Sequence, residues 1–167
     1  SGHFANFELM SMEITKKNTK LATIYRPLNN IFLNPLMEYL RKKYICENQI
    51  KKGINGVRDA IEFIHNNHSI ALMIDQRVSE GTKLDFFGKP ALTTTLPAQL
   101  AIKYNMDIIP VFIERKNFDK FEIEFLEKID PKEFKDKWIL SKKLNSILEK
   151  MIIRNPNQWI WTHNRWK

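Results

Sequence analysis

The sequence contains a single cysteine, Cys46, among its 167 residues. One thiol excludes an intramolecular disulfide and any zinc site that is built from several cysteines. The sequence also lacks a run of about 18 apolar residues, the length that a membrane-spanning helix needs, and no signal peptide is recognisable in it. No internal repeat or low-complexity linker interrupts the chain. These features are typical of one globular domain that folds on its own hydrophobic core.

The charge of the chain is strongly basic. Lys and Arg number 27 against 19 Asp and Glu, which leaves a formal net charge of +8. Basic residues cluster at 41–43 with 51–52 and again within 132–150, where a solvated helix face accounts for most of them. The surplus favours an anionic partner, which could be nucleic acid, an anionic membrane face, a phosphorylated substrate or an acidic protein. Charge alone does not choose among these four.

Helical and strand patterns alternate along the chain. Continuous apolar runs at 70–74 and 108–113 are typical of buried strands, and residues 121–126 alternate as a half-exposed strand does. Together these patterns predict an α/β fold, a single domain with a mixed, mostly covered β-sheet flanked by helices. The predicted helices are 6–15, 32–43, 57–64, 94–104 and 138–153, and the predicted strands are 21–25, 70–74, 84–87, 108–113 and 121–126.

The first candidate site is a histidine and a carboxylate near the start of the sequence, His3 and Glu8. On one continuous helix these side chains would point about 140° apart, so they meet only if the backbone turns between them. A junction of loop and helix provides such a turn. Glu8 could then accept one imidazole N–H and leave the other nitrogen as a base for a hydroxyl that attacks an acyl group. The spacing alone fits a surface histidine near a helix start equally well.

Residues 2–8 resemble the catalytic box of the bacterial lipid A biosynthesis (lauroyl/myristoyl) acyltransferases, a family of the lysophospholipid acyltransferase superfamily. The family's box commonly reads Gly-His-Phe-Gly-Asn-Trp-Glu, from which Ala5 and Phe7 depart. Further blocks follow in the family's order at 25–30, 75–98, 109–111 and 158–167. The resemblance therefore extends over almost the whole sequence.

The resemblance implies an acyltransferase domain over residues 1–167 with a glycerolphosphate-acyltransferase-like fold. It implies a membrane-associated O-acyltransferase of lipopolysaccharide biosynthesis, which moves a fatty acyl chain from an acyl carrier protein thioester to a hydroxyl of a lipid A precursor. His3 would be the general base and Glu8 its orienting partner, with no metal or other cofactor. The expected location is the cytoplasmic face of the bacterial inner membrane, on its anionic surface. The family's N-terminal membrane-anchoring region is expected to be missing from this chain.

The same resemblance suggests substrate-binding roles for Arg26, Asp75, Arg77, Gly81 and Thr82. Arg26 could hold a phosphate or an oxyanion, or it could be a salt-bridged surface residue. Asp75 follows a predicted buried strand, at the sheet edge where ligands gather in α/β folds, although a carboxylate capping a loop fits as well. Arg77 could pair with Asp75 or face an acidic ligand. Gly81 and Thr82 partly match a phosphate-binding block of the superfamily.

Three alternatives stay open at this point. The acceptor could be another glycolipid or a lysolipid instead of a lipid A precursor. The chain could be a basic nucleic-acid-binding module, although no known nucleic-acid-binding signature occurs in it and we expect no nucleic-acid partner. His65 and His68 could suggest a metal site, but without an acidic or cysteine partner at a known spacing they better fit the end of a helix.

Overall fold

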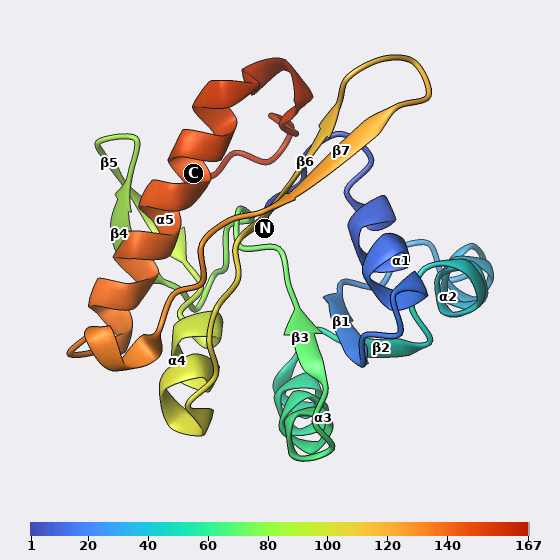
Figure 1. Cartoon of the computed structure of the whole chain (residues 1–167), viewed down its shortest axis with the longest axis horizontal. Helices are drawn as coiled ribbons and strands as arrows, with labels where there is room; N and C mark the ends of the chain where they lie inside the picture. The colour runs from blue at the N-terminus through green and yellow to red at the C-terminus, as the bar shows by residue number, and fades with distance from the viewer. Residues whose placement is uncertain (167) are drawn as a thin grey trace. The chain divides into compact units, whose positions relative to one another are not determined.

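The computed structural model describes residues 1–166 and confirms a mixed α/β fold (Figure 1). The chain divides into two compact units: unit 1 comprises Ser1–Asn6 and Met73–Lys167, and unit 2 comprises Phe7–Leu72. The helices are α1 (Glu8–Lys16), α2 (Asn34–Tyr44), α3 (Ile54–His65), α4 (Leu96–Tyr104) and α5 (Lys137–Arg154). The strands are β1 (Leu21–Tyr25), β2 (Asn48–Lys51), β3 (Ser69–Ala71), β4 (Thr82–Phe86), β5 (Lys89–Thr93), β6 (Val111–Arg115) and β7 (Phe121–Phe125).

Unit 2 is built on a three-stranded parallel sheet in the order β2-β1-β3. Parallel neighbours need a long crossover, and α2 and α3 lie in the two segments that connect these strands in sequence. Ala22 of β1 stands opposite Asn48 and Ile70 in the ladder. Its side chain lies in a fully buried cluster with Ile50 and Ala60, so α3 covers this face of the sheet.

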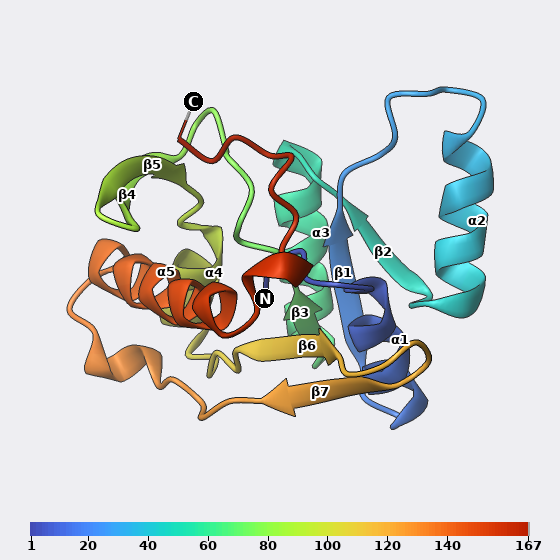
Figure 2. The ribbon, with the colours of Figure 1, turned by 90° about the horizontal axis from the view of Figure 1, so that it is seen from above.

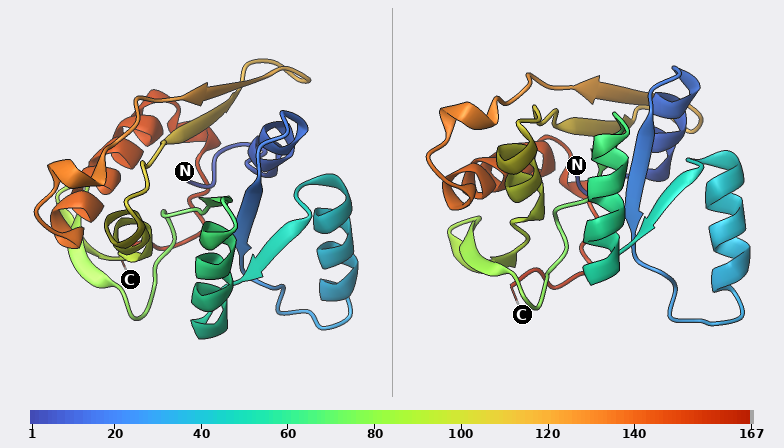
Figure 3. Two further views of the ribbon diagram at one scale, coloured as in Figure 1. Left: turned by 60° about the horizontal axis from the view of Figure 1, so that its bottom comes forward. Right: turned by 90° about the horizontal axis from the view of Figure 1, so that it is seen from below.

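The helix α2 is attached to unit 2 mainly by polar contacts, and none of its residues is buried. It lies beside β2 at the edge of the sheet (Figure 3). The carboxylate of Glu38 accepts hydrogen bonds from the Tyr25 hydroxyl (2.9 Å) and the Asn34 amide (2.8 Å), and it pairs with Lys51 at 3.0 Å. The donors Lys51, Asn34 and Tyr25 together lower the pKa of Glu38 from 4.5 to about 2.

Unit 1 contains two β-hairpins packed with α4 and α5 (Figure 2). The β4–β5 hairpin turns at Phe87 and Gly88, whose φ angles of 53° and 70° match the two positive values of a type I′ turn. The long helix α5 contributes its apolar face to the core, and Asp136 caps its first turn by accepting hydrogen bonds from two backbone N–H groups. The buried Phe4 ring packs edge-on against Phe112.

The strands form three small sheets within residues 1–166, where one continuous mixed sheet was expected. The physical reason is local: short turns join β4 to β5 and β6 to β7, so each pair forms its own antiparallel ladder. The strands β2 and β5 were not predicted, and β3 is shorter than the apolar run at 70–74. No helix in the described part of the chain has both the length and the apolar character to cross a bilayer. The extent of the acyltransferase domain stays a prediction.

We expect Glu38→Gln to lower the free energy of unfolding at pH 7 by about 1–2 kcal/mol, since the charged partner of Lys51 is lost. The folded-state pKa of Glu38 is depressed, so its contribution is complete above pH 4.5 and declines as the pH falls toward about 2. The difference between parent and variant should therefore shrink on acidification. Urea denaturation followed by circular dichroism between pH 7 and pH 3 measures it.

Glu13→Gln is the matched control, because Glu13 pairs with Lys16 on the exposed surface of α1 and such pairs contribute little. A Glu38→Gln variant as stable as the parent at pH 7 would contradict the attachment of α2 through this carboxylate.

Candidate active site

A histidine–aspartate pair forms the centre of the candidate site in unit 1. Residues 1–6 run beside the segment that begins at Met73, and the Ile74 N–H donates to the Ser1 carbonyl at 2.9 Å. This pairing brings His3 against Asp75, with Nδ1 of the imidazole 2.6 Å from Oδ1 of the carboxylate. The backbone N–H of His3 donates to Oδ2 of the same carboxylate at 2.6 Å. Asp75 therefore holds both the main chain and the ring of His3.

The Asp75 carboxylate is ionised although it is only 3% exposed. Burial opposes its charge, but the hydrogen bonds and charge of His3 and the Trp159 indole N–H, which donates to Oδ2 at 2.9 Å, outweigh that cost. The pKa of Asp75 consequently lies below its usual range. Gly2 permits this close approach, because a Cβ there would lie 3.1 Å from Oδ2 and 2.8 Å from Cδ1 of Leu148.

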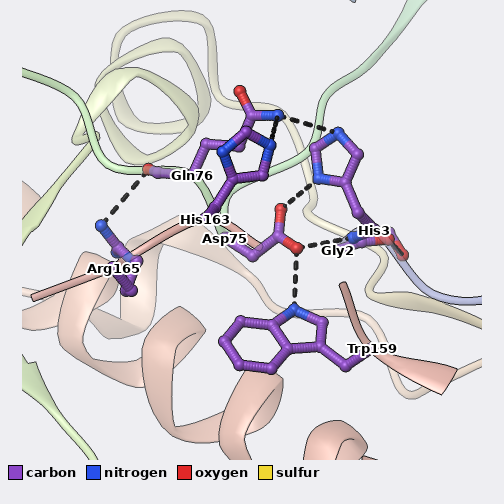
Figure 4. Close-up of polar contacts among 8 residues, drawn as sticks. Gly2, His3, Asp75, Gln76, Trp159, His163 and Arg165 are labelled. Atoms are coloured by element: carbon purple, nitrogen blue, oxygen red, sulfur yellow. Dashed lines mark hydrogen bonds and ion pairs between the residues drawn. The ribbon is translucent and has the colours of Figure 1, made fainter. Parts of the chain in front are cut away.

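Gln76 lies on the other side of the imidazole (Figure 4). Its amide nitrogen is 3.2 Å from Nε2 of His3 and 3.3 Å from Nε2 of His163, so one NH₂ group can donate to both rings. A proton on Nδ1 facing Asp75 and a lone pair on Nε2 facing Gln76 satisfy both contacts of His3 at once. In this tautomer, Nε2 is the nitrogen that can accept a proton.

Arg165 of the C-terminal segment makes hydrogen bonds beside the site. Its guanidinium is fully buried and donates to the Gln76 carbonyl at 3.3 Å, to the Leu92 carbonyl and to the Thr93 hydroxyl at 2.9 Å. Burial lowers the pKa of Arg165, and the nearby charge of Asp75 opposes that shift. These hydrogen bonds connect β5 with the segment that contains Asp75 and Gln76. Lys167, the last residue of the 158–167 block, lies outside the described residues.

The other predicted site residues are distributed over both units. Glu8 belongs to unit 2, where its carboxylate pairs with Nε of Arg41 at 2.8 Å, while the carboxylate beside Nδ1 of His3 is that of Asp75. Arg26, also in unit 2, is exposed. Asp75, which was expected to bind substrate, contacts the imidazole of His3. The role of Glu8 as the orienting partner of His3 stays a prediction.

The remaining candidates of unit 1 follow Asp75 along the chain. Arg77 is exposed, and Thr82 begins β4 opposite Thr93. Gly81 is packed against backbone, because a Cβ there would lie 2.7 Å from the Thr93 carbonyl oxygen and 2.9 Å from that of Val78. This steric need explains the glycine, and its binding role stays a prediction.

Three residues make contacts in the site that the sequence analysis did not predict. Gln76, Trp159 and Arg165 were noted only as parts of matching blocks or as packing residues. Their polar groups contact Asp75, His3 or the backbone beside them. A tryptophan and an arginine in a short C-terminal block carry no local signal for contacts 84 and 89 residues away. The only sequence signal for these two residues was the resemblance of the 158–167 block to the family.

The site contains a buried carboxylate with a lowered pKa, and an imidazole that lies between this carboxylate and the amide of Gln76. Such a pair performs general base catalysis on a hydroxyl. Among residues 1–166, no group of three or more His, Cys, Asp or Glu side chains is placed to hold a metal ion. His68, one of the two histidines considered for a metal, has its Nδ1 3.1 Å from the Asn66 carbonyl oxygen.

Comparison with known families agrees with this chemistry. The profile of the family described as bacterial lipid A biosynthesis acyltransferase matches residues 1–167. The chain belongs to this family and is an acyltransferase of lipid A biosynthesis. A search of curated proteins finds no significant match.

We expect Trp159→Phe to raise the pKa of Asp75, because the variant removes an N–H that stabilises the charged carboxylate. Carbon-13 NMR titration of the Asp75 carboxyl measures the shift. Trp161→Phe is the matched control, since the Trp161 indole donates to the Pro156 carbonyl and not to Asp75. Equal titration curves for parent and Trp159→Phe would contradict the stabilising role of the indole.

Proposed function

We propose that this protein transfers a fatty acyl chain from an acyl carrier protein thioester to a hydroxyl of a lipid A precursor, with His3 as general base and Asp75 as the carboxylate that orients it. The observation that carries the proposal is the 2.6 Å contact between Nδ1 of His3 and Oδ1 of Asp75. Membership of the lipid A acyltransferase family supplies the reaction class. The acyl donor and the acceptor hydroxyl are the parts we add.

The proposed reaction begins at Nε2 of His3, which removes the proton of the acceptor hydroxyl as its oxygen attacks the thioester carbonyl. A tetrahedral intermediate with a negatively charged oxygen forms, and its collapse breaks the carbon–sulfur bond. The imidazolium then returns its proton to the departing thiolate, so the products are an ester and the free thiol of the carrier. Asp75 stabilises the positive charge that develops on the ring and keeps Nδ1–H in place.

Gln76 supports this assignment of the reacting nitrogen. Its amide lies against Nε2 of His3, on the side of the ring opposite the Asp75 contact. An acceptor hydroxyl that gives up its proton must reach the same nitrogen. We therefore infer that the acceptor displaces the Gln76 amide when it binds.

Glu8 has a different role in this proposal from the one that the resemblance implied. Its pairing with Arg41 favours a structural or substrate-positioning function within unit 2, and the orienting function falls to Asp75. Arg26, Arg77, Gly81 and Thr82 remain our candidates for the phosphates of the acceptor or for the oxyanion.

The cellular setting is likewise proposed. A net charge of +8 suits both an acidic carrier protein and an anionic membrane surface, and a lipid acceptor places the reaction at a membrane. We infer that the protein works at the cytoplasmic face of the bacterial inner membrane. Another glycolipid or a lysolipid is the alternative acceptor.

The test is acyl transfer from acyl carrier protein thioester to a tetraacyl lipid A precursor dispersed in detergent. We expect His3→Ala and Asp75→Asn each to lower kcat by about 10²–10⁴-fold. His3→Ala removes the proposed base, and Asp75→Asn removes the carboxylate that orients it. His65→Ala and Asp107→Asn, which change exposed residues, should leave kcat near the parent value.

The Glu8→Gln variant tests which of the two carboxylates, Glu8 or Asp75, orients His3. Full loss with Glu8→Gln and near-normal turnover with Asp75→Asn would return the orienting role to Glu8. Unchanged transfer in His3→Ala would remove the mechanism. Acylation of a lysolipid or of another glycolipid, with none of the lipid A precursor, would establish the alternative acceptor.

A further inference from the structure

The segment from Leu28 to Tyr44 presents an unusual apolar surface, which we call the α2 surface. It includes the outer side of α2 and the loop before it. Its large apolar side chains are exposed to solvent by fractions from 38% to 85%. They are Leu28 (38%), Ile31 (75%), Phe32 (85%), Leu33 (51%), Leu36 (54%), Tyr39 (56%) and Tyr44 (57%).

The orientation of α2 is inverted relative to an ordinary surface helix. Such a helix buries its apolar stripe and exposes its polar residues. In α2, Glu38 contacts Tyr25 and Lys51, and Arg41 contacts Glu8. Helical spacing places Phe32, Leu36, Tyr39, Leu40 and Tyr44 on one face, and all of these except Leu40 are exposed. Met37 and Leu40 are half-buried, and the exposed apolar side chains are left for another contact.

The charges around the α2 surface are positive. Lys42 and Lys43 are exposed on the same helix, and Nζ of Lys43 lies 5.5 Å from the ring centre of Tyr39 and 5.1 Å from that of Tyr44. Glu38 is the one acidic residue from 26 to 46 in the sequence, and its carboxylate is engaged by Lys51, Asn34 and Tyr25. The surface thus combines exposed aromatic and aliphatic side chains with lysines and has no exposed carboxylate.

We propose that the α2 surface docks on an anionic lipid bilayer, with Phe32 and Leu36 inserted at the headgroup boundary and Lys42 and Lys43 among the lipid phosphates. Helices that lie in a membrane interface have this combination of an apolar face and lysine flanks. Tyrosine rings also favour the headgroup level. This inference rests on the proposed function, since a lipid acceptor has to be reached from a bilayer.

A bilayer fits these side chains better than an acidic protein or a nucleic acid. Either of those partners would be bound chiefly by its charges, and the charges of the α2 surface are few beside its apolar area. Lysines add attraction that is sensitive to salt, whereas the apolar side chains add attraction that is not. Binding to vesicles should accordingly weaken with salt but persist in part.

The experiment is flotation of the 167-residue protein with vesicles of phosphatidylglycerol and phosphatidylethanolamine. We expect the double variant Phe32→Ser with Leu36→Ser to bind at least about tenfold more weakly than the parent. Lys42→Gln with Lys43→Gln should bind roughly tenfold more weakly at low salt, and vesicles of phosphatidylcholine alone should bind the parent poorly. Circular dichroism melting checks that each variant is folded.

Two matched controls change equally exposed residues elsewhere. Phe118→Ser alters a side chain that is 92% exposed in the β6–β7 turn, and Lys142→Gln with Lys143→Gln alters an adjacent lysine pair on α5. Both should bind vesicles like the parent. Loss of binding in these controls equal to that in the α2 variants would overturn the assignment to the α2 surface.

Other outcomes also decide the question. Absence of parent binding to the anionic vesicles, or equal binding by the Phe32/Leu36 variant, refutes the docking surface. The docking surface is also refuted if light scattering shows that the parent is a dimer, and if the Phe32/Leu36 variant is a monomer that still binds vesicles as the parent does. His3→Ala should bind vesicles normally and fail in acyl transfer, whereas the Phe32/Leu36 variant should acylate detergent-dispersed acceptor normally. A failure of docking is thereby distinguished from a failure of the proposed reaction.

Discussion

The buried carboxylate of Asp75 is the group on which unit 1 and its chemistry depend. A charge that is removed from water destabilises a fold unless donors surround it. Here the donors are the main chain and ring of His3 and the indole of Trp159, from opposite ends of the sequence. The contacts that make this charge tolerable also join the two ends of the chain to its middle. Under the proposed mechanism, the contacts that stabilise the buried charge in unit 1 also orient the general base.

The surroundings of this carboxylate form a continuous polar arrangement. Arg165 donates to the backbone of Gln76, and the Gln76 side chain in turn contacts both His3 and His163. A substitution at one member should therefore disturb its neighbours, as is usual in buried networks. In the proposed reaction, the acceptor hydroxyl has to reach the nitrogen that Gln76 contacts, so binding of the acceptor would disturb these hydrogen bonds.

The sequence pattern of α2 fits a helix whose apolar face is buried and equally a helix whose apolar face is exposed. The spacing of Phe32, Leu36, Tyr39, Leu40 and Tyr44 predicts a helix, and the helix is present. Periodicity shows that these side chains share a face, but it does not show what that face contacts. Polar contacts through Glu38 and Arg41 decide the question, because they hold the opposite side of the helix against unit 2.

The sequence by itself determined the helices and most strands, and it drew attention to His3 and Asp75, because periodicity and short motifs depend on neighbouring residues. It missed β2, whose residues Asn48–Lys51 are mostly polar and pair with β1 through the backbone. Only the tertiary structure decided that the imidazole meets Asp75, 72 residues along the chain, and that Trp159 completes the site. Such contacts depend on how the whole of unit 1 packs, and no local pattern encodes that.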